Sequence, residues 1–182
     1  MKSKFTVYLF LAIVLTGVVI AAFFLRSTEN YILPVSITTE KQQELESKVL
    51  EFDQKIKDFE GPVSADLMTL FVEKAKAEED LGRIGDAIQT MKLGIERFQY
   101  TIVGWNNIAR LYEKVGRYDL AIPILKDLVE QYALLNYNLD IAQDYRKMGD
   151  KEQAKEAYQE YLKTGQQDLE LETYLNHSVQ AP

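Results

Sequence analysis

The fold is decided by residues 102–134, which read IVGWNNIARLYEKVGRYDLAIPILKDLVEQYAL. Apolar residues recur there at helical spacing in two stretches of about 14 residues, on either side of Gly116. A glycine between two such stretches indicates a left-handed turn that ends one helix before the next begins. This segment is therefore predicted to form a helix, a tight turn and a second helix.

The same pattern occurs three times along the chain. Gly-x-x-x-x-Ala is found at residues 82–87, 116–121 and 149–154, and its alanines are spaced by 34 and 33 residues. Each copy lies between two amphipathic stretches. A fixed period of this length with helix–turn–helix character indicates a stacked array of helix pairs.

The middle unit resembles the tetratricopeptide repeat (TPR). The residues that carry the resemblance are Trp105, Ile108, Ala109, Tyr112, Gly116, Tyr118, Ala121 and Leu125. The third unit matches at Asn138, Ile141, Ala142, Tyr145, Ala154 and Tyr158, and a degenerate first unit at Phe71, Lys74, Ala75, Glu78, Ala87 and Met91. We expect the alanines where helices pack closely and the aromatic residues, Trp105 included, in the core. The resemblance implies an all-α solenoid of about three TPR helix pairs.

Another helix is predicted before the repeats. Thr39, with Gln42 three residues later, fits a helix-capping box. The apolar residues that follow form one stripe, which we expect to pack against the first repeat: Leu45, Val49, Phe52, Ile56 and Phe59. A closing helix that begins at Asp168 should cover the last repeat, since a terminal repeat cannot bury its outer face alone.

The most apolar stretch of the chain is residues 6–25, TVYLFLAIVLTGVVIAAFFL, which carries no charge and no proline. At about 1.5 Å per residue a helix of this length spans the hydrocarbon core of a bilayer. Lys2 and Lys4 precede it, so the positive-inside rule places the N-terminus in the cytoplasm. A cleaved signal peptide is the alternative, but cleavage after Ala22 would leave the apolar terminus Phe23-Phe24-Leu25.

These observations divide the chain into consecutive segments. The predicted segments are a cytoplasmic N-terminus at 1–5, a transmembrane signal anchor at 6–25, a linker in the form of an extended spacer at 26–38, an amphipathic helix at 39–60, TPR units at 64–99, 102–134 and 135–167, a C-terminal capping helix at 168–176 and a tail at 177–182. The resulting localisation is a single-pass protein of the bacterial inner membrane with the repeats outside the cytoplasm.

Composition argues against most enzyme classes. The 182 residues include no cysteine and one histidine, His177, so thiol nucleophiles and His- or Cys-based metal cages are excluded. Without the three bases of residues 1–26, 18 bases oppose 28 acids, a net charge of −10 that disfavours nucleic acid as a partner. No catalytic constellation, cofactor, metal or small-molecule substrate is predicted, and residues 78–80 are expected to be a solvated acidic run.

The candidate binding site is the groove lined by the first helix of each pair, where TPR proteins hold peptides. The candidate residues are Lys76, Asn106, Asn107, Arg110, Lys114, Gln143, Arg146 and Lys147. Their bases on an acidic domain predict partner segments that carry acidic groups. The carboxylate clamp of chaperone-binding TPR proteins is matched only at Asn107, so a chaperone-tail receptor is not supported.

Three functions are compatible with these features. The first is a membrane-anchored scaffold or adaptor that binds other proteins in envelope protein assembly, translocation or quality control, a layout similar to that of translocon-associated TPR proteins. The second is a cytosol-facing targeting receptor, which needs the opposite topology. The third is a passive structural oligomeriser.

Overall fold

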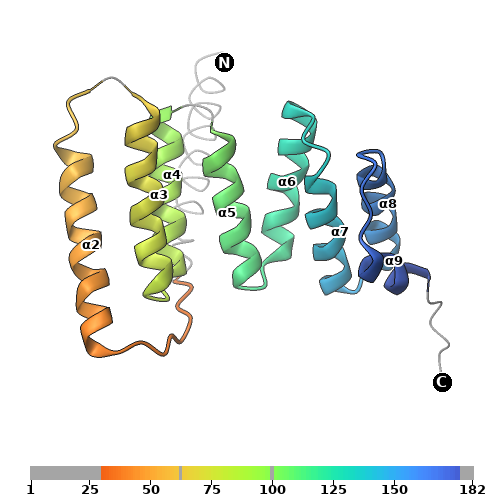
Figure 1. Cartoon of the computed structure of the whole chain (residues 1–182), viewed down its shortest axis with the longest axis horizontal. Coiled ribbons are helices and arrows are strands. Elements are labelled where there is room, and N and C mark those ends of the chain that lie inside the picture. Colours follow the sequence, from red (N-terminus) through yellow and green to blue (C-terminus); the bar gives the residue numbers. More distant parts are fainter. Residues whose placement is uncertain (1–29, 62, 99–100, 177–182) are drawn as a thin grey trace, which may run out of the picture.

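The computed structural model describes residues 30–61, 63–98 and 101–176. Eight helices follow one another in this part of the chain, side by side in one layered array (Figure 1). Their bounds are α2 Thr39–Lys57, α3 Ala65–Asp80, α4 Ile84–Phe98, α5 Ile102–Lys114, α6 Tyr118–Tyr132, α7 Tyr137–Met148, α8 Lys151–Leu162 and α9 Leu169–Asn176. The prediction of an all-α solenoid is confirmed.

Three helix pairs, α3–α4, α5–α6 and α7–α8, form the body of the solenoid. The alanines of the repeated pattern, Ala87, Ala121 and Ala154, are fully buried, because a larger side chain would force the close-packed helices apart. The glycine that ends the first helix of each pair has a positive φ, between 73° and 80°, which favours glycine over any residue with a Cβ. Short-range sequence signals therefore place these turns correctly.

One residue of the predicted core departs from expectation. Tyr112 and Tyr158 are buried, but the Trp105 side chain is 36% exposed. An indole ring is so large that a single inter-helix space seldom covers it completely. Trp105 therefore lies at the surface of α5, and the prediction that it is core is corrected.

Helix α2 lies along the first repeat. Leu45 packs with Ala77 and Leu81 near one end of α3, and Ile56 packs with Leu67 and Phe71 near the other. The residue that caps α2 is Thr38, one position before the predicted Thr39: its backbone is extended, and its hydroxyl accepts a hydrogen bond from the Lys41 N–H at 3.2 Å. The helix ends at Lys57, before the predicted boundary at residue 60.

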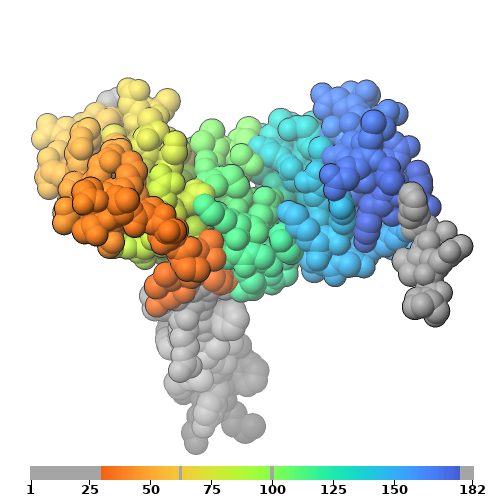
Figure 2. Space-filling model, turned by 60° about the horizontal axis from the view of Figure 1, so that its bottom comes forward, coloured from red at the N-terminus to blue at the C-terminus, as the bar shows by residue number. Residues whose placement is uncertain are grey.

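The linker before α2 is not a free spacer. Its described part, residues 30–38, is called the docked linker below. The Leu33 N–H donates to the Gly82 carbonyl at 2.8 Å, and the Gly85 N–H donates to the Tyr31 carbonyl at 3.1 Å. The Tyr31 ring meets the Tyr112 ring edge to face, 6.5 Å between centroids. The docked linker thus lies against the first two repeats (Figure 2).

At the other end, α9 closes the array. The Asp168 carboxylate accepts a hydrogen bond from the Leu171 N–H at 2.8 Å and so caps the helix, as the sequence predicts. Leu171 is completely buried against the last repeat. The short helix therefore supplies the apolar cover that the terminal helix pair needs.

The predicted anchor, residues 6–25, lies outside the described residues, as do 1–5 and 177–182. Across the described ranges, no helix combines the length and the apolar character needed to cross a bilayer.

Candidate functional site

The first helices of the three pairs, α3, α5 and α7, line one face of the solenoid, which we call the inner face. The first crevice is the space between α3 and α5, where two pockets lie. The second crevice is defined by the facing charged residues of α5 and α7, which are Glu113, Asp140, Asp144 and Lys147. Most of the candidate residues of the groove lie in or beside these two crevices.

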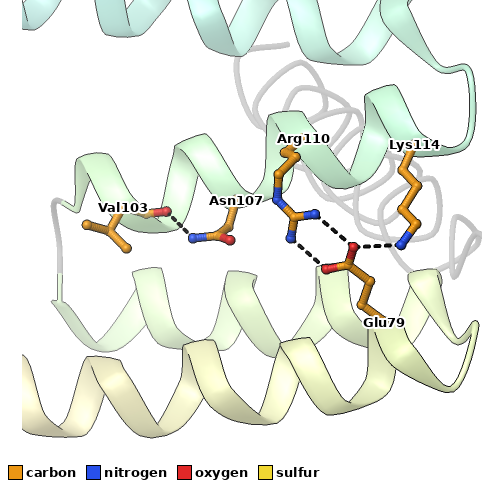
Figure 3. A network of polar contacts seen from close by, with 5 residues as sticks. All are labelled: Glu79, Val103, Asn107, Arg110 and Lys114. Carbon is orange, nitrogen blue, oxygen red and sulfur yellow. Dashed lines mark hydrogen bonds and ion pairs between the residues drawn. The ribbon is translucent and has the colours of Figure 1, made fainter.

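The polar end of the first crevice is built on a buried carboxylate (Figure 3). Glu79 is 8% exposed, and its two oxygens accept hydrogen bonds from Arg110 at 2.8 and 2.6 Å. Lys114 donates a third at 2.7 Å. The hydrogen bonds from Arg110, aided by Lys114 and opposed by burial, lower the pKa of Glu79 to about 2. The carboxylate is therefore ionised and fully matched by opposite charge.

Two pockets run along the first crevice from this ion cluster. The nearer, of about 220 Å³, is lined by Lys76, Asp80 and Asn107 together with Val72. The farther, of about 470 Å³, is predominantly apolar, and its walls are Met68, Thr69, Val72, Phe98, Thr101 and Val103 with residues 63–65. Val72 belongs to both, so the first crevice offers an apolar pocket continuous with a charged one.

The second crevice has a different charge balance. Glu113 of α5 and Asp140 and Asp144 of α7 influence one another electrostatically. Asp144 is 1% exposed; one oxygen lies 3.5 Å from the Lys147 ammonium, and the other has no hydrogen-bond partner among the described residues. Burial, and next the charge of Glu113, raise the pKa of Asp144 to about 7. Burial also raises the pKa values of Glu113 and Asp140.

The two crevices use equivalent positions of successive repeats. Glu113 follows Glu79 by 34 residues, and Gln143 and Lys147 follow Arg110 and Lys114 by 33. The second crevice therefore has the acid and the lysine of the first but a glutamine in place of the arginine. Gln143 donates instead to Asp168, at 3.4 Å. Among the described residues, none makes a hydrogen bond or a close ion pair with the Glu113 carboxylate.

The structure distributes the predicted site residues as follows. Lys76, Asn107 and Arg110 share one pocket wall, and Asn106 is half-buried on α5 outside both pocket linings. Arg146 pairs with Glu170 of α9 at 2.9 Å and stacks on Tyr174. Arg110, Lys114 and Arg146 therefore each have an acidic partner within the protein, which sequence reasoning did not predict.

The prediction that residues 78–80 form a solvated acidic run is wrong for two of the three residues. Glu78 is buried, accepts a hydrogen bond from the Thr90 hydroxyl at 2.7 Å and lies 3.5 Å from Lys74. Glu79 is buried by the contacts already described, and only Asp80 is exposed. The signal that could have revealed Glu79 is its spacing of 31 and 35 residues from two bases, about one repeat period.

Within the described ranges, no group of three or more histidine, aspartate or glutamate side chains is arranged to hold a metal ion.

Comparison with protein-family models finds two matches. Residues 103–132 and residues 138–164 each match a model described as tetratricopeptide repeat. These segments contain all of α5–α6 and of α7–α8 except the first residue of each pair. The chain thus contains TPR units at the two places where the sequence resemblance is strongest, and α3–α4 precedes them as a third helix pair.

Comparison with solved structures finds one protein with a similar fold among those named here. A protein described as "Crystal structure of MamA" aligns with a TM-score of 0.53 and 16% identity, over 72% of this chain and 75% of that one. A second, described as "Crystal structure of MamA protein", aligns with a TM-score of 0.47 and 17% identity, over 70% and 75% of the two chains. At this identity the first likeness shows the fold alone. No curated protein matches the sequence.

Proposed function

We propose that this protein is a membrane-anchored TPR scaffold that holds segments of other proteins on its inner face. TPR arrays are protein-interaction units, because stacked helix pairs create a long concave surface from side chains that the fold does not otherwise need. The proposal assigns the binding of partner segments to the first and second crevices and gives residues 6–25 the role of anchor.

The observation that carries the binding role is the apolar pocket of the first crevice. Its volume of about 470 Å³ accommodates a large apolar side chain, and Val103 on its wall is 53% exposed. A concave apolar pocket beside a few fixed polar groups is the usual form of a recognition site. A partner segment with an apolar residue at this pocket gains hydrophobic contact there and polar contact along Lys76 and Asn107.

The test is a charge placed on the pocket wall. Val103→Glu should abolish crosslinks between the full-length protein and its partners in native cells, measured by mass spectrometry. Leu93→Glu on α4 is the matched control, because Leu93 has the same 53% exposure but does not line the pocket. Equal recovery of partners by both variants would place the binding site elsewhere.

The anchor role is supported by the 20-residue uncharged stretch 6–25 and the lysines before it. We place the repeats outside the cytoplasm of a bacterial cell, where the scaffold would serve envelope protein assembly, translocation or quality control. A cysteine introduced at Gln180 should react with a membrane-impermeant reagent on intact cells. Protection of that cysteine would instead support the cytosol-facing receptor.

A further inference from the structure

In the second crevice, Glu113 has no basic partner within hydrogen-bond distance among the described residues. Its equivalent in the first crevice, Glu79, is paired with Arg110. Arg110 approaches Glu79 with both terminal nitrogens, at 2.8 and 2.6 Å. The equivalent of Arg110 on α7 is Gln143, which is engaged with Asp168 and carries no charge. Glu113 therefore lacks the guanidinium that the same backbone arrangement supplies one repeat earlier.

The surroundings increase the negative potential at this point. The groups that face Glu113 are Asp140, Asp144 and Lys147 of α7 and, from its own helix, Arg110, which is bound to Glu79. Three carboxyl groups thus share one lysine, Lys147, whose ammonium lies 3.5 Å from Asp144 and over the Tyr118 ring. Asp144 is a second, independent indication that this site suits a cation, since it is 1% exposed and one of its oxygens has no hydrogen-bond partner among the described residues. Buried polar atoms without partners are uncommon in proteins.

We propose that the second crevice binds an arginine or lysine side chain of the partner segment, with Glu113 as its main acceptor. The partner's cation would occupy, on Glu113, the place that Arg110 occupies on Glu79. This inference rests on the proposed function, and it changes the partner's chemistry: the segment would carry an apolar residue for the first crevice and a basic residue for the second, instead of acidic groups.

The first experiment uses peptides as probes. A random peptide library is selected on the full chain, and each selected peptide is resynthesised with arginine replaced by citrulline and lysine by acetyl-lysine, which keep the shape but remove the charge. The change should weaken binding to the wild-type chain by about tenfold, the effect of losing a charge-assisted hydrogen bond. On Glu113→Gln it should weaken binding less than about twofold.

Two further variants sharpen the result. Gln143→Arg should also lose the preference for basic peptides, because its own guanidinium would fill the site as Arg110 does in the first crevice. Glu130→Gln, an exposed acid on α6, is the matched control and should behave as wild type. Circular dichroism checks that each variant is folded.

The outcomes separate this inference from the proposed function. Peptides that are lost on Val103→Glu, yet bind the wild-type chain equally with arginine or citrulline, would leave the scaffold function intact and overturn the basic-side-chain site. A library that yields no binder would overturn both. As an independent measurement, N-acetylargininamide should shift the carboxyl ¹³C resonance of Glu113, and its citrulline analogue should not. Equal shifts from the two probes would also overturn the inference.

Discussion

The two crevices of the inner face occupy equivalent positions in successive repeats, yet they balance charge in opposite ways. In the first, Glu79 has two basic partners and a lowered pKa. In the second, Glu113 has none within hydrogen-bond distance among the described residues, and neighbouring Asp144 has a raised pKa. The repeated backbone therefore does not repeat the electrostatics. Gln143 stands where the first crevice has Arg110. Asp140 and Asp144 stand where it has Asn107 and Leu111, so the ion cluster of the first crevice is replaced by a group with unmatched negative charge.

The turns behind the two crevices differ as well. Gly82, before α4, lies under the docked linker, and a Cβ at this position would come within 2.2 Å of the Leu33 carbonyl oxygen. Gly116, before α6, has the same left-handed backbone, but no described atom lies within 4 Å of the equivalent Cβ position. The turn within the first helix pair is thus covered by the docked linker, and the turn within the second is not.

The largest expected effect comes from this pair of glycines. Gly82→Ala should destabilise the protein by about 3 kcal/mol, because it adds a clash with the docked linker to the cost of a left-handed alanine. Gly116→Ala pays only the backbone cost, about 1 kcal/mol. Urea denaturation of the full chain measures both values. Equal losses would mean that the linker does not cover the turn.

Removing the arginine of the first crevice should have the next largest effect. Arg110→Met leaves the buried Glu79 with Lys114 alone and should cost about 2 kcal/mol, less than for a fully buried pair because Arg110 is half exposed. The equivalent change in the second crevice, Gln143→Met, should cost under about 0.5 kcal/mol, since Gln143 has only a long hydrogen bond. Thermal denaturation of the two variants measures both losses of stability. Equal losses would contradict the difference assigned to the two crevices.

The two crevices should also respond to pH in opposite directions. Asp144 has a pKa of about 7 in the fold against an ordinary value of 3.8, so the folded chain holds the extra proton between these values. Its contribution to stability is complete below about pH 4 and is lost as pH rises through about 7. Asp144→Asn should therefore stabilise the protein at pH 8 and leave it nearly unchanged at pH 4.

The contribution of Glu79 to stability depends on pH in the opposite direction. Its pKa falls from 4.5 to about 2, so its contribution is present above about pH 4.5 and is lost as pH falls toward 2. Urea denaturation at a series of pH values, for wild type and Asp144→Asn, separates the two slopes. A wild-type stability that does not change between pH 5 and pH 8 would contradict the contribution assigned to Asp144.

The smallest expected effect on stability comes from giving the second crevice the arginine of the first. Gln143→Arg places a guanidinium on Glu113 and should stabilise the protein by about 0.5 kcal/mol, the usual range for a partly exposed ion pair. It should also lower the pKa of Glu113, measurable by carboxyl ¹³C NMR. A pKa that stays raised would show that Gln143 and Arg110 are not equivalent in space.

The solenoid was predictable because its signals are local. The spacing of Gly82, Gly116 and Gly149 and of the alanines that follow them is visible in one sequence, and each signal acts within a single helix pair. The same holds for Asp168, whose side chain caps the helix that begins one residue later. The membrane anchor at residues 6–25 stays a prediction.

The contacts that sequence reasoning missed join different units. The sequence alone predicts a solvated acidic run at Glu79, because its partners lie 31 and 35 residues later, on the next repeat. Tyr31 gave no sign of its contact with Tyr112, because a spacer sequence has no period that would reveal a docking site. The repeat pattern is enough to place the groove residues on the inner face. Whether a basic residue there forms an ion pair depends on the side chains of the neighbouring helix, which the pattern does not show.

The docked linker also decides where mechanical force enters the repeats. Because Tyr31 and Leu33 are hydrogen-bonded at the turn between α3 and α4, tension applied to the chain before residue 30 reaches this turn first. The ring contact between Tyr31 and Tyr112 spreads that tension to α5 of the next pair. Ile37, which packs against Leu45 of α2 and Leu81, connects the rest of the linker to α2 and to the end of α3. If the chain is anchored through residues 6–25, as proposed, a pull on the anchor reaches the first two helix pairs before the rest of the solenoid.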